Sequence, residues 1–185
     1  MTEGKGAGST PFFVGTVEPL VRHNRLRYEH TTRFVGKLSG DVLDCGEPNL
    51  LKEMLEKANG IRITNTTGDL DVTPPAGSYD AVLAFEVIEH LMNPLSFLTN
   101  VRNVLKPNGS LFLSTPINKP KFLWRSDHFH EFDEYRLKVL IDRAGFRVVR
   151  KEIRRFYRLN GIRPLIRALA KSGTVFLELT PEKAS

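Results

Sequence analysis

The sequence predicts an α/β fold, in which a doubly wound and mostly parallel sheet ends in an antiparallel strand. Three observations support this fold class. A short apolar run ends at Asp44 and is followed by Gly46 and a helical pattern, which is how a ligand-binding strand–turn–helix unit begins. A nearly continuous apolar run covers residues 79–87, as in a strand buried on both faces. A Lys-Pro-Asn-Gly turn at 106–109 leads into a further apolar run at 110–115.

Length and composition indicate one globular domain over residues 1–185. Hydrophobic residues make up 41% of the chain and charged residues 26%, and no apolar run is long enough to span a bilayer. The first residues lack the apolar core of a signal peptide, so we expect 1–15 to form a flexible tail. Cys45 is the single cysteine, which favours a reducing cytoplasm over a disulfide-forming compartment.

The elements can be assigned in chain order. A weakly amphipathic segment at 16–37 predicts one or two helices before the first strand. Leu51, Met54, Leu55 and Ala58 lie on one face of the helix after Gly46, and Asn49 occupies its capping position. A second helix is expected to begin at Pro94.

Three stretches in this order resemble motifs of the class I S-adenosylmethionine-dependent methyltransferases. Residues 42–46 (VLDCG) resemble the first motif of that family, 78–91 resemble its fourth strand and the following turn, and 105–116 resemble its turn into the fifth strand. The resemblance covers about residues 40–146 and implies a Rossmann-like sheet. It also implies that S-adenosylmethionine is the cofactor.

The resemblance assigns cofactor binding to residues at the ends of the expected strands. These residues are Asp44, Cys45, Gly46, Asn65, Asp69, Leu70, Phe85 and Glu86. One departure concerns the glycine-rich loop, where the family's later glycines are replaced by Glu47, Pro48 and Asn49. Proline has no N–H, so one donor to the cofactor's carboxylate is missing.

The second strand, expected over 61–65, ends in Asn65, where the family usually has an acidic residue that binds the ribose. The nearest acids are Asp69 and Asp71, beside Gly68 in a segment that also fits an ordinary turn. Because this segment resembles a later turn of the family, the fold is expected to be compressed between strands 2 and 4.

The loop at 116–132 follows a strand and contains the single tryptophan, Trp124, together with His128 and His130. A histidine titrates near neutrality and can act as a general base, so His128 and His130 are the catalytic candidates. An alternative is that one of them fixes the loop by bonding to the backbone. A metal site with Glu131 is disfavoured because a single cluster is a weak signal, and we predict no metal.

The last part of the chain predicts a helix capped by Asp133 and then an antiparallel strand pair at 146–153 and 173–180. Between these strands lies a basic insert, 154–171. Residues 147–171 contain nine basic residues and one acid, Glu152. The insert can form an amphipathic helix that lies on a membrane surface, contacts an anionic partner or substrate, or packs against the domain.

The sequence therefore predicts S-adenosylmethionine-dependent methyl transfer to a small-molecule acceptor, and an anionic acceptor is one of the options. The alternative is a non-catalytic scaffold or binding protein that keeps the fold and holds an anionic partner with the basic insert. A nucleic-acid partner is disfavoured because the insert is not studded with aromatic residues. The sequence does not specify the acceptor atom or the oligomeric state.

Overall fold

The computed structural model describes residues 17–156 and 162–182, with side chains described from residue 24 onward. The tail predicted at 1–15 lies outside these residues. The helices are α1 (Val17–Val35), α2 (Leu50–Asn59), α3 (Pro94–Val104), α4 (Glu134–Arg143) and α5 (Ile162–Leu169), with short 3₁₀ turns η1 (Ile88–His90) and η2 (Lys121–Leu123). The strands are β1 (Val42–Asp44), β2 (Ile63–Asn65), β3 (Tyr79–Phe85), β4 (Leu105–Ile117), β5 (Phe146–Arg154) and β6 (Gly173–Pro181).

The six strands form one sheet in the order β2-β1-β3-β4-β6-β5. The first four are parallel, and β6 is antiparallel to both β4 and β5. The chain runs from β2 to β3 without an intervening helix or strand in the described segment 66–78. The predicted sheet, its antiparallel end and its compression are therefore confirmed.

Local capping explains where several helices begin. Asn49 Oδ1 accepts hydrogen bonds from the N–H groups of Leu51 and Lys52 at the start of α2. Asn93 caps α3, with Pro94 in its first turn, and the Asp133 side chain accepts from Arg136 N at the start of α4. These side chains satisfy N–H groups that the helix itself leaves without partners.

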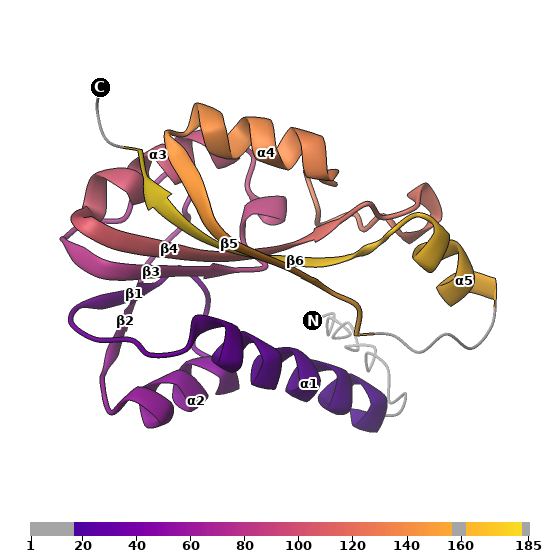
Figure 1. Cartoon of the computed structure of the whole chain (residues 1–185), viewed down its shortest axis with the longest axis horizontal. Helices are drawn as coiled ribbons and strands as arrows, with labels where there is room; N and C mark the ends of the chain where they lie inside the picture. Colours follow the sequence, from indigo (N-terminus) through magenta and orange to yellow (C-terminus); the bar gives the residue numbers. More distant parts are fainter. Residues whose placement is uncertain (1–16, 157–161, 183–185) are drawn as a thin grey trace, which may run out of the picture.

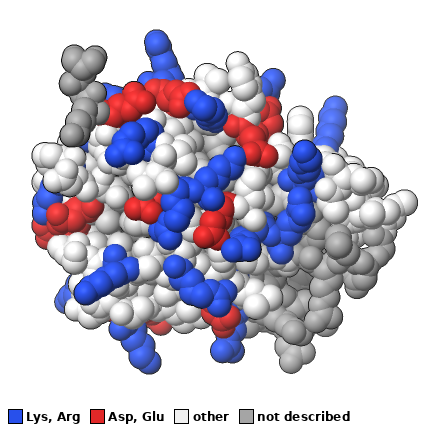
Figure 2. Space-filling model, viewed as in Figure 1, with Lys and Arg blue, Asp and Glu red and all other residues white. Residues whose placement is uncertain are grey.

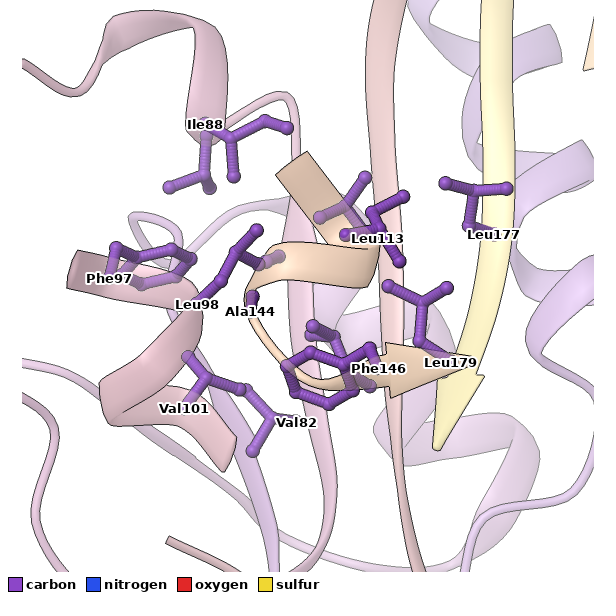
Figure 3. Close-up of a cluster of buried hydrophobic side chains, with 14 of the residues drawn as sticks. Val82, Ile88, Phe97, Leu98, Val101, Leu113, Ala144, Phe146, Leu177 and Leu179 are labelled. Carbon is purple, nitrogen blue, oxygen red and sulfur yellow. The ribbon is translucent and has the colours of Figure 1, made fainter. Parts of the chain in front are cut away.

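The helices cover both faces of the sheet, with α1 and α2 on one side and α3 and α4 on the other (Figure 1). Each side has its own apolar cluster. On the α3 side, Phe97, Leu98 and Val101 pack against strand residues such as Val82 and Leu113, as Figure 3 shows. These five side chains are at most 1% exposed, so this close-packed layer fixes α3 and the strand ends beside it.

Three strands differ from the sequence expectation by two residues or more. Strand β2 begins at Ile63, two residues after the predicted start at residue 61. Strand β3 ends at Phe85, two residues before the predicted end, because Glu86 adopts a left-handed backbone with φ of 57°. Strand β4 is longer than predicted and already begins at Leu105. In the part of the chain that the structure describes, no helix combines the length and hydropathy that crossing a bilayer requires.

Candidate active site

A small cavity of about 60 Å³ lies at the edge where the parallel strands end. This edge is where open α/β sheets bind their ligands. The cavity lining includes Arg27, Asp44, Gly46, Phe85, Glu86 and Ser114. Four of these, Asp44, Gly46, Phe85 and Glu86, are cofactor-binding candidates from the sequence.

Asp44 is the last residue of β1 and is 7% exposed. Its Oδ1 accepts a hydrogen bond of 3.0 Å from the backbone N–H of Gly46. Burial raises the pKa of Asp44 to about 6, although the Gly46 N–H and the nearby charge of Lys52 act in the opposite direction. The site therefore contains a buried carboxyl group that changes its charge about one pH unit below neutrality.

The other cofactor candidates on this side have different surroundings. Cys45 is buried in the apolar core, and burial raises the pKa of its thiol to about 12. Asn65, at the end of β2, donates to the carbonyl of Gly46 at 2.9 Å and accepts from Lys52 Nζ. It therefore connects the second strand to the glycine turn.

The segment after β2 forms a turn that is held by its two acids. Asp69 accepts from the Asp71 N–H through Oδ1, and its carbonyl accepts from the N–H groups of residues 72 and 73. The Asp71 carboxylate accepts from the N–H groups of Met92 and Asn93. Leu70 is half-buried and packs against the core. Neither Asp69 nor Leu70 is among the residues that line the small cavity.

Glu86 occupies a special position at the end of β3. Its left-handed backbone aims the carboxylate at two partners. Oε2 accepts from Arg27 Nη1 of α1 at 2.9 Å, and Oε1 accepts from Ser114 Oγ of β4 at 2.8 Å. A non-glycine residue in this conformation costs free energy and persists where its surroundings hold it. Glu86 thus joins α1 to the sheet at the site.

A second and larger cavity of about 440 Å³ adjoins the first. Arg27 and Glu86 line both cavities, so this ion pair stands where the two meet. The larger cavity is also lined by residues of the loop after β4, by the end of β5 and by the segment that enters β6. Its charged and titratable lining includes Lys119, Arg125, His128, Arg154 and Arg167.

The structure separates the two catalytic candidates. His128 lines the larger cavity, and its Nδ1 lies 3.2 Å from Lys119 Nζ and 3.3 Å from Glu131 Oε1. Burial, followed by the charge of Lys119, lowers the pKa of His128. His130 is not among the lining residues, stacks on Phe132, and has its Nε2 3.4 Å from the carbonyl of Met92.

A buried group beside His128 was not singled out from the sequence. Glu89 is 1% exposed and accepts from Thr115 Oγ1 at 2.9 Å. Burial, followed by repulsion from Glu86, raises the pKa of Glu89 to about 8.

Glu89, His90 and His128 each offer one ligand atom within 4.8 Å of the others. His90 bonds through Nδ1 to the carbonyl of Asp127 at 2.7 Å. The pattern Glu-His in a turn after a buried strand could have drawn attention to this cluster.

On β5, three of the nine basic residues in 147–171 form ion pairs within the fold. Arg150 pairs with Glu178, Lys151 with Glu134, and Arg154 with Glu152. Figure 2 shows the result, because Lys and Arg side chains on this face are interspersed with Asp and Glu. Strand β5 is therefore less basic as a surface than the sequence count suggests.

The residues at the small cavity fit the methionine end of S-adenosylmethionine, which carries a carboxylate and an ammonium group. Arg27 offers a cation, and Asp44 and Glu86 offer carboxyl groups in the same lining. At Gly46 φ is not positive, and a Cβ there would meet only an ordinary contact, 3.4 Å from Asp44 Oδ1. The fold therefore does not require glycine here, and the missing side chain leaves the backbone open to close approach by a ligand.

Comparison with known proteins identifies relatives over much of the chain. A family model described as "Methyltransferase domain" matches residues 20–151, well over half of the chain. A ubiquinone biosynthesis O-methyltransferase of Cereibacter sphaeroides is 42% identical over 92 residues, which cover 47% of this chain and 37% of that protein. A probable S-adenosylmethionine-dependent methyltransferase of Mycolicibacterium smegmatis is 35% identical over 154 residues, covering 69% of this chain and 58% of the relative. The chain thus spans about a third to just over half of the length of these relatives.

Solved structures share the fold at low sequence identity. A chain of the complex between the Haloferax volcanii Trm112 methyltransferase activator and the putative methyltransferase gives a TM-score of 0.70 at 14% identity, covering 89% of this chain and 93% of that one. An O-methyltransferase of a Brevibacillus brevis multienzyme, in complex with S-adenosyl-L-homocysteine, gives 0.58 at 12% identity, covering 89% and 76%. With the matched family model and the Rossmann-like sheet, these findings show that the chain belongs to the methyltransferase domain family, within the class I S-adenosylmethionine-dependent superfamily.

Proposed function

We propose that this protein transfers a methyl group from S-adenosylmethionine to an oxygen of a small, anionic acceptor. The observation that carries the proposal is the shared wall of the two cavities. Arg27 and Glu86 line both, so a cofactor in one and an acceptor in the other would meet at this pair. The methyltransferase names of the relatives favour catalysis over the non-catalytic alternative. A cytoplasmic location stays a prediction from the single cysteine.

The cofactor side uses residues at the ends of the parallel strands. When bound, S-adenosylmethionine supplies an electrophilic methyl group on a sulfonium. We assign its methionine end to Arg27, Asp44, Gly46 and Glu86, which line the small cavity. Its adenosine end would lie toward Asn65, Asp69 and Leu70, along the same edge of the sheet, with Cys45 beneath and Phe85 at the wall. The chain's own contribution is to position the reactants.

The acceptor side is the larger cavity, whose lining holds more cationic than acidic side chains, although Arg27, Lys119, Arg125 and Arg154 are each paired with a carboxylate. Its cationic side chains are those of Arg27, Lys119, Arg125, Arg154 and Arg167, whereas Glu86 is the acidic residue of the lining. Arginine forks and a lysine point charge suit a carboxylate or phosphate group. A concave site of this size also suits a small molecule. A nucleic acid is not favoured, because the basic side chains of β5 are paired with carboxylates.

His128 is the residue that we assign as general base. Its lowered pKa keeps the imidazole neutral near pH 7, so the ring can accept the proton that an acceptor hydroxyl loses. Glu131 accepts from Lys119 at 2.9 Å and lies 3.3 Å from His128 Nδ1. The proposal requires the Nδ1 proton to be directed to Glu131, so that Nε2 carries the lone pair that takes up the proton. It excludes a hydrogen bond from Lys119 Nζ, 3.2 Å away, to a lone pair on Nδ1.

Calorimetric titration with S-adenosylmethionine and with S-adenosylhomocysteine tests the cofactor assignment directly. We expect both ligands to bind with a micromolar dissociation constant. Absence of binding at millimolar concentration would contradict the proposal and restore the scaffold interpretation.

A methyltransferase assay against small phenolic or hydroxy carboxylates and their neutral amides then tests the acceptor class. Preference for the neutral amides would contradict the anionic assignment while leaving the cofactor site intact.

A further inference from the structure

Helix α5 presents its apolar side to solvent. Ile162, Leu165 and Leu169 are 73%, 55% and 75% exposed, and none of the residues of α5 is buried. These positions follow the spacing of one helical face. Pro164, Arg167 and Ala168 are the less exposed residues, so the helix turns its less apolar side toward the protein. A surface helix normally has the opposite orientation, and this one therefore displays an apolar stripe, defined as Ile162, Leu165, Ile166 and Leu169.

The neighbouring loop after β4 also exposes large apolar side chains. Phe122, Trp124 and Phe129 are each more than half exposed. The loop and α5 are neighbours because Ile117, the last residue of β4, pairs with Gly173, the first residue of β6. Figure 1 shows both segments at the same end of the molecule. The apolar stripe of α5 and these three aromatic residues of the loop are together called the apolar surface below.

The charges around this surface have a net positive sign. Arg163 is exposed on α5, and Lys121 is exposed on the loop. No acidic residue occurs in the sequence between Glu152 and Glu178. The loop acids Asp127 and Glu131 are paired with Arg125 and Lys119. In Figure 2 the described atoms at the end where α5 lies are mostly white, with Lys and Arg side chains beside them.

We propose that the apolar stripe of α5 and the exposed aromatic residues of the loop dock on the surface of an anionic lipid bilayer. Apolar residues beside basic ones, with Trp and Phe at the boundary, are the chemistry by which an interfacial helix binds lipid. The basic rim complements the anionic head groups. The arrangement would place the rim of the larger cavity next to the lipid, because Arg125 and Arg167 line that cavity.

Vesicle binding by the whole protein tests this proposal. The probes are vesicles of phosphatidylcholine and phosphatidylglycerol in equal parts, compared with vesicles of phosphatidylcholine alone. We expect co-sedimentation with the anionic vesicles that weakens when salt is added. Trp124 is the single tryptophan of the chain, so its emission should shift to the blue and be quenched by brominated lipid.

Two variants identify the surface. Leu165→Ser combined with Leu169→Ser should weaken binding to anionic vesicles by at least about tenfold, because it removes apolar area that enters the lipid. Arg163→Gln should weaken binding about fivefold. The matched control combines Val72→Ser and Val139→Ser, at residues that are 77% and 47% exposed and lie outside the apolar surface. We expect this control to bind vesicles like the wild type.

Three results would overturn the proposal. The first is failure of the wild type to bind anionic vesicles, and the second is equal vesicle binding by the wild type and the α5 variant. The third is a concentration-dependent dimer that the α5 variant cannot form, because it would assign the stripe to a second copy of the chain. If the double variant does not fold, Arg163→Gln and the Trp124 emission of the wild type decide the question.

Discussion

The two cavities meet at Arg27 and Glu86 but are built from different kinds of structure. The smaller cavity uses the ends of β1, β3 and β4, the turn at Gly46 and residues of α1. The larger uses the loop after β4, the end of β5 and Arg167 of α5. The first therefore depends on sheet topology, which a family shares, whereas the second depends on connecting segments, which vary with the ligand.

Each cavity has a buried carboxyl group in it or beside it, and the two groups differ in pKa. Asp44 lines the smaller cavity, and Glu89 lies beside His128 of the larger one. Burial raises the pKa of Asp44 only to about 6, because the Gly46 N–H and Lys52 stabilise its charged form. Glu89 has a hydrogen bond from Thr115 but is also repelled by Glu86, and its pKa rises to about 8. We therefore expect Asp44 to be mostly charged at neutral pH, where Glu89 is mostly protonated.

The largest effect is expected on the acceptor side. His128→Ala should lower turnover by about 100-fold to 10,000-fold, because it removes the proposed base, while cofactor affinity stays unchanged. Steady-state kinetics and calorimetry together measure this separation. In the wild type, the lowered pKa of His128 should let the rate persist until the pH falls below the ordinary histidine range. His130→Ala is the matched control, and an equal loss in both variants would remove the distinction between the two histidines.

The second effect concerns stability and the charge of Glu89. The pKa of the folded state, about 8, lies above the ordinary value of 4.5, so the folded protein holds a proton that the unfolded chain releases between these values. The stabilisation is complete below the unfolded pKa and is lost as the pH rises toward 8. Glu89→Gln, which stays neutral, should lessen the decline in unfolding free energy between about pH 5 and about pH 9 by about 2–4 kcal/mol.

Urea denaturation at several pH values measures that decline. Glu47→Gln is a suitable control because Glu47 is exposed in the turn after Gly46. If wild type and Glu89→Gln lose stability in parallel, Glu89 is charged in the folded state at neutral pH. The contrast between the two buried carboxyl groups would then be wrong.

The third effect is on the cofactor side. Asp44→Ala should weaken binding of S-adenosylhomocysteine by about 10-fold to 100-fold, because it removes a buried hydrogen-bonding carboxylate. Calorimetry measures the change. Asp41→Ala, just before the other end of β1, where the carboxylate pairs with Lys106, should leave the affinity unchanged. Unchanged affinity in Asp44→Ala would show that the small cavity does not hold the cofactor.

The smallest expected effect is on ligand affinity when the Arg27–Glu86 ion pair, which lines both cavities, is broken. Arg27→Gln removes the 2.9 Å ion pair to Glu86 and should weaken both cofactor and acceptor binding roughly tenfold. Arg25→Gln on the same helix breaks a more exposed pair with Glu29 and should change neither affinity by more than about twofold. Loss of one affinity alone would mean that Arg27 serves a single cavity.

Much of the fold could be predicted from the sequence because its signals are local. The apolar run into Asp44, Gly46 and the Asn49 cap defined the first strand–turn–helix unit, and the structure confirms it. The compressed sheet was also predictable, because the segment around Gly68 and Asp69 resembles a later turn of the family and follows directly on the second strand. Such signals depend on residue spacing, which the chain carries in one dimension.

Tertiary structure decided which side chains meet. The left-handed backbone of Glu86 and its bond to Arg27, which is 59 positions away, have no local signature. The sequence offered His128 and His130 as equals, and packing placed His128 in the larger cavity beside Glu89. In the sequence, the basic residues of β5 form one positively charged feature. In the fold, Arg150 pairs with Glu178 and Lys151 with Glu134, which are distant in sequence. Local spacing determines elements, whereas pairings between distant residues exist only once the elements have packed.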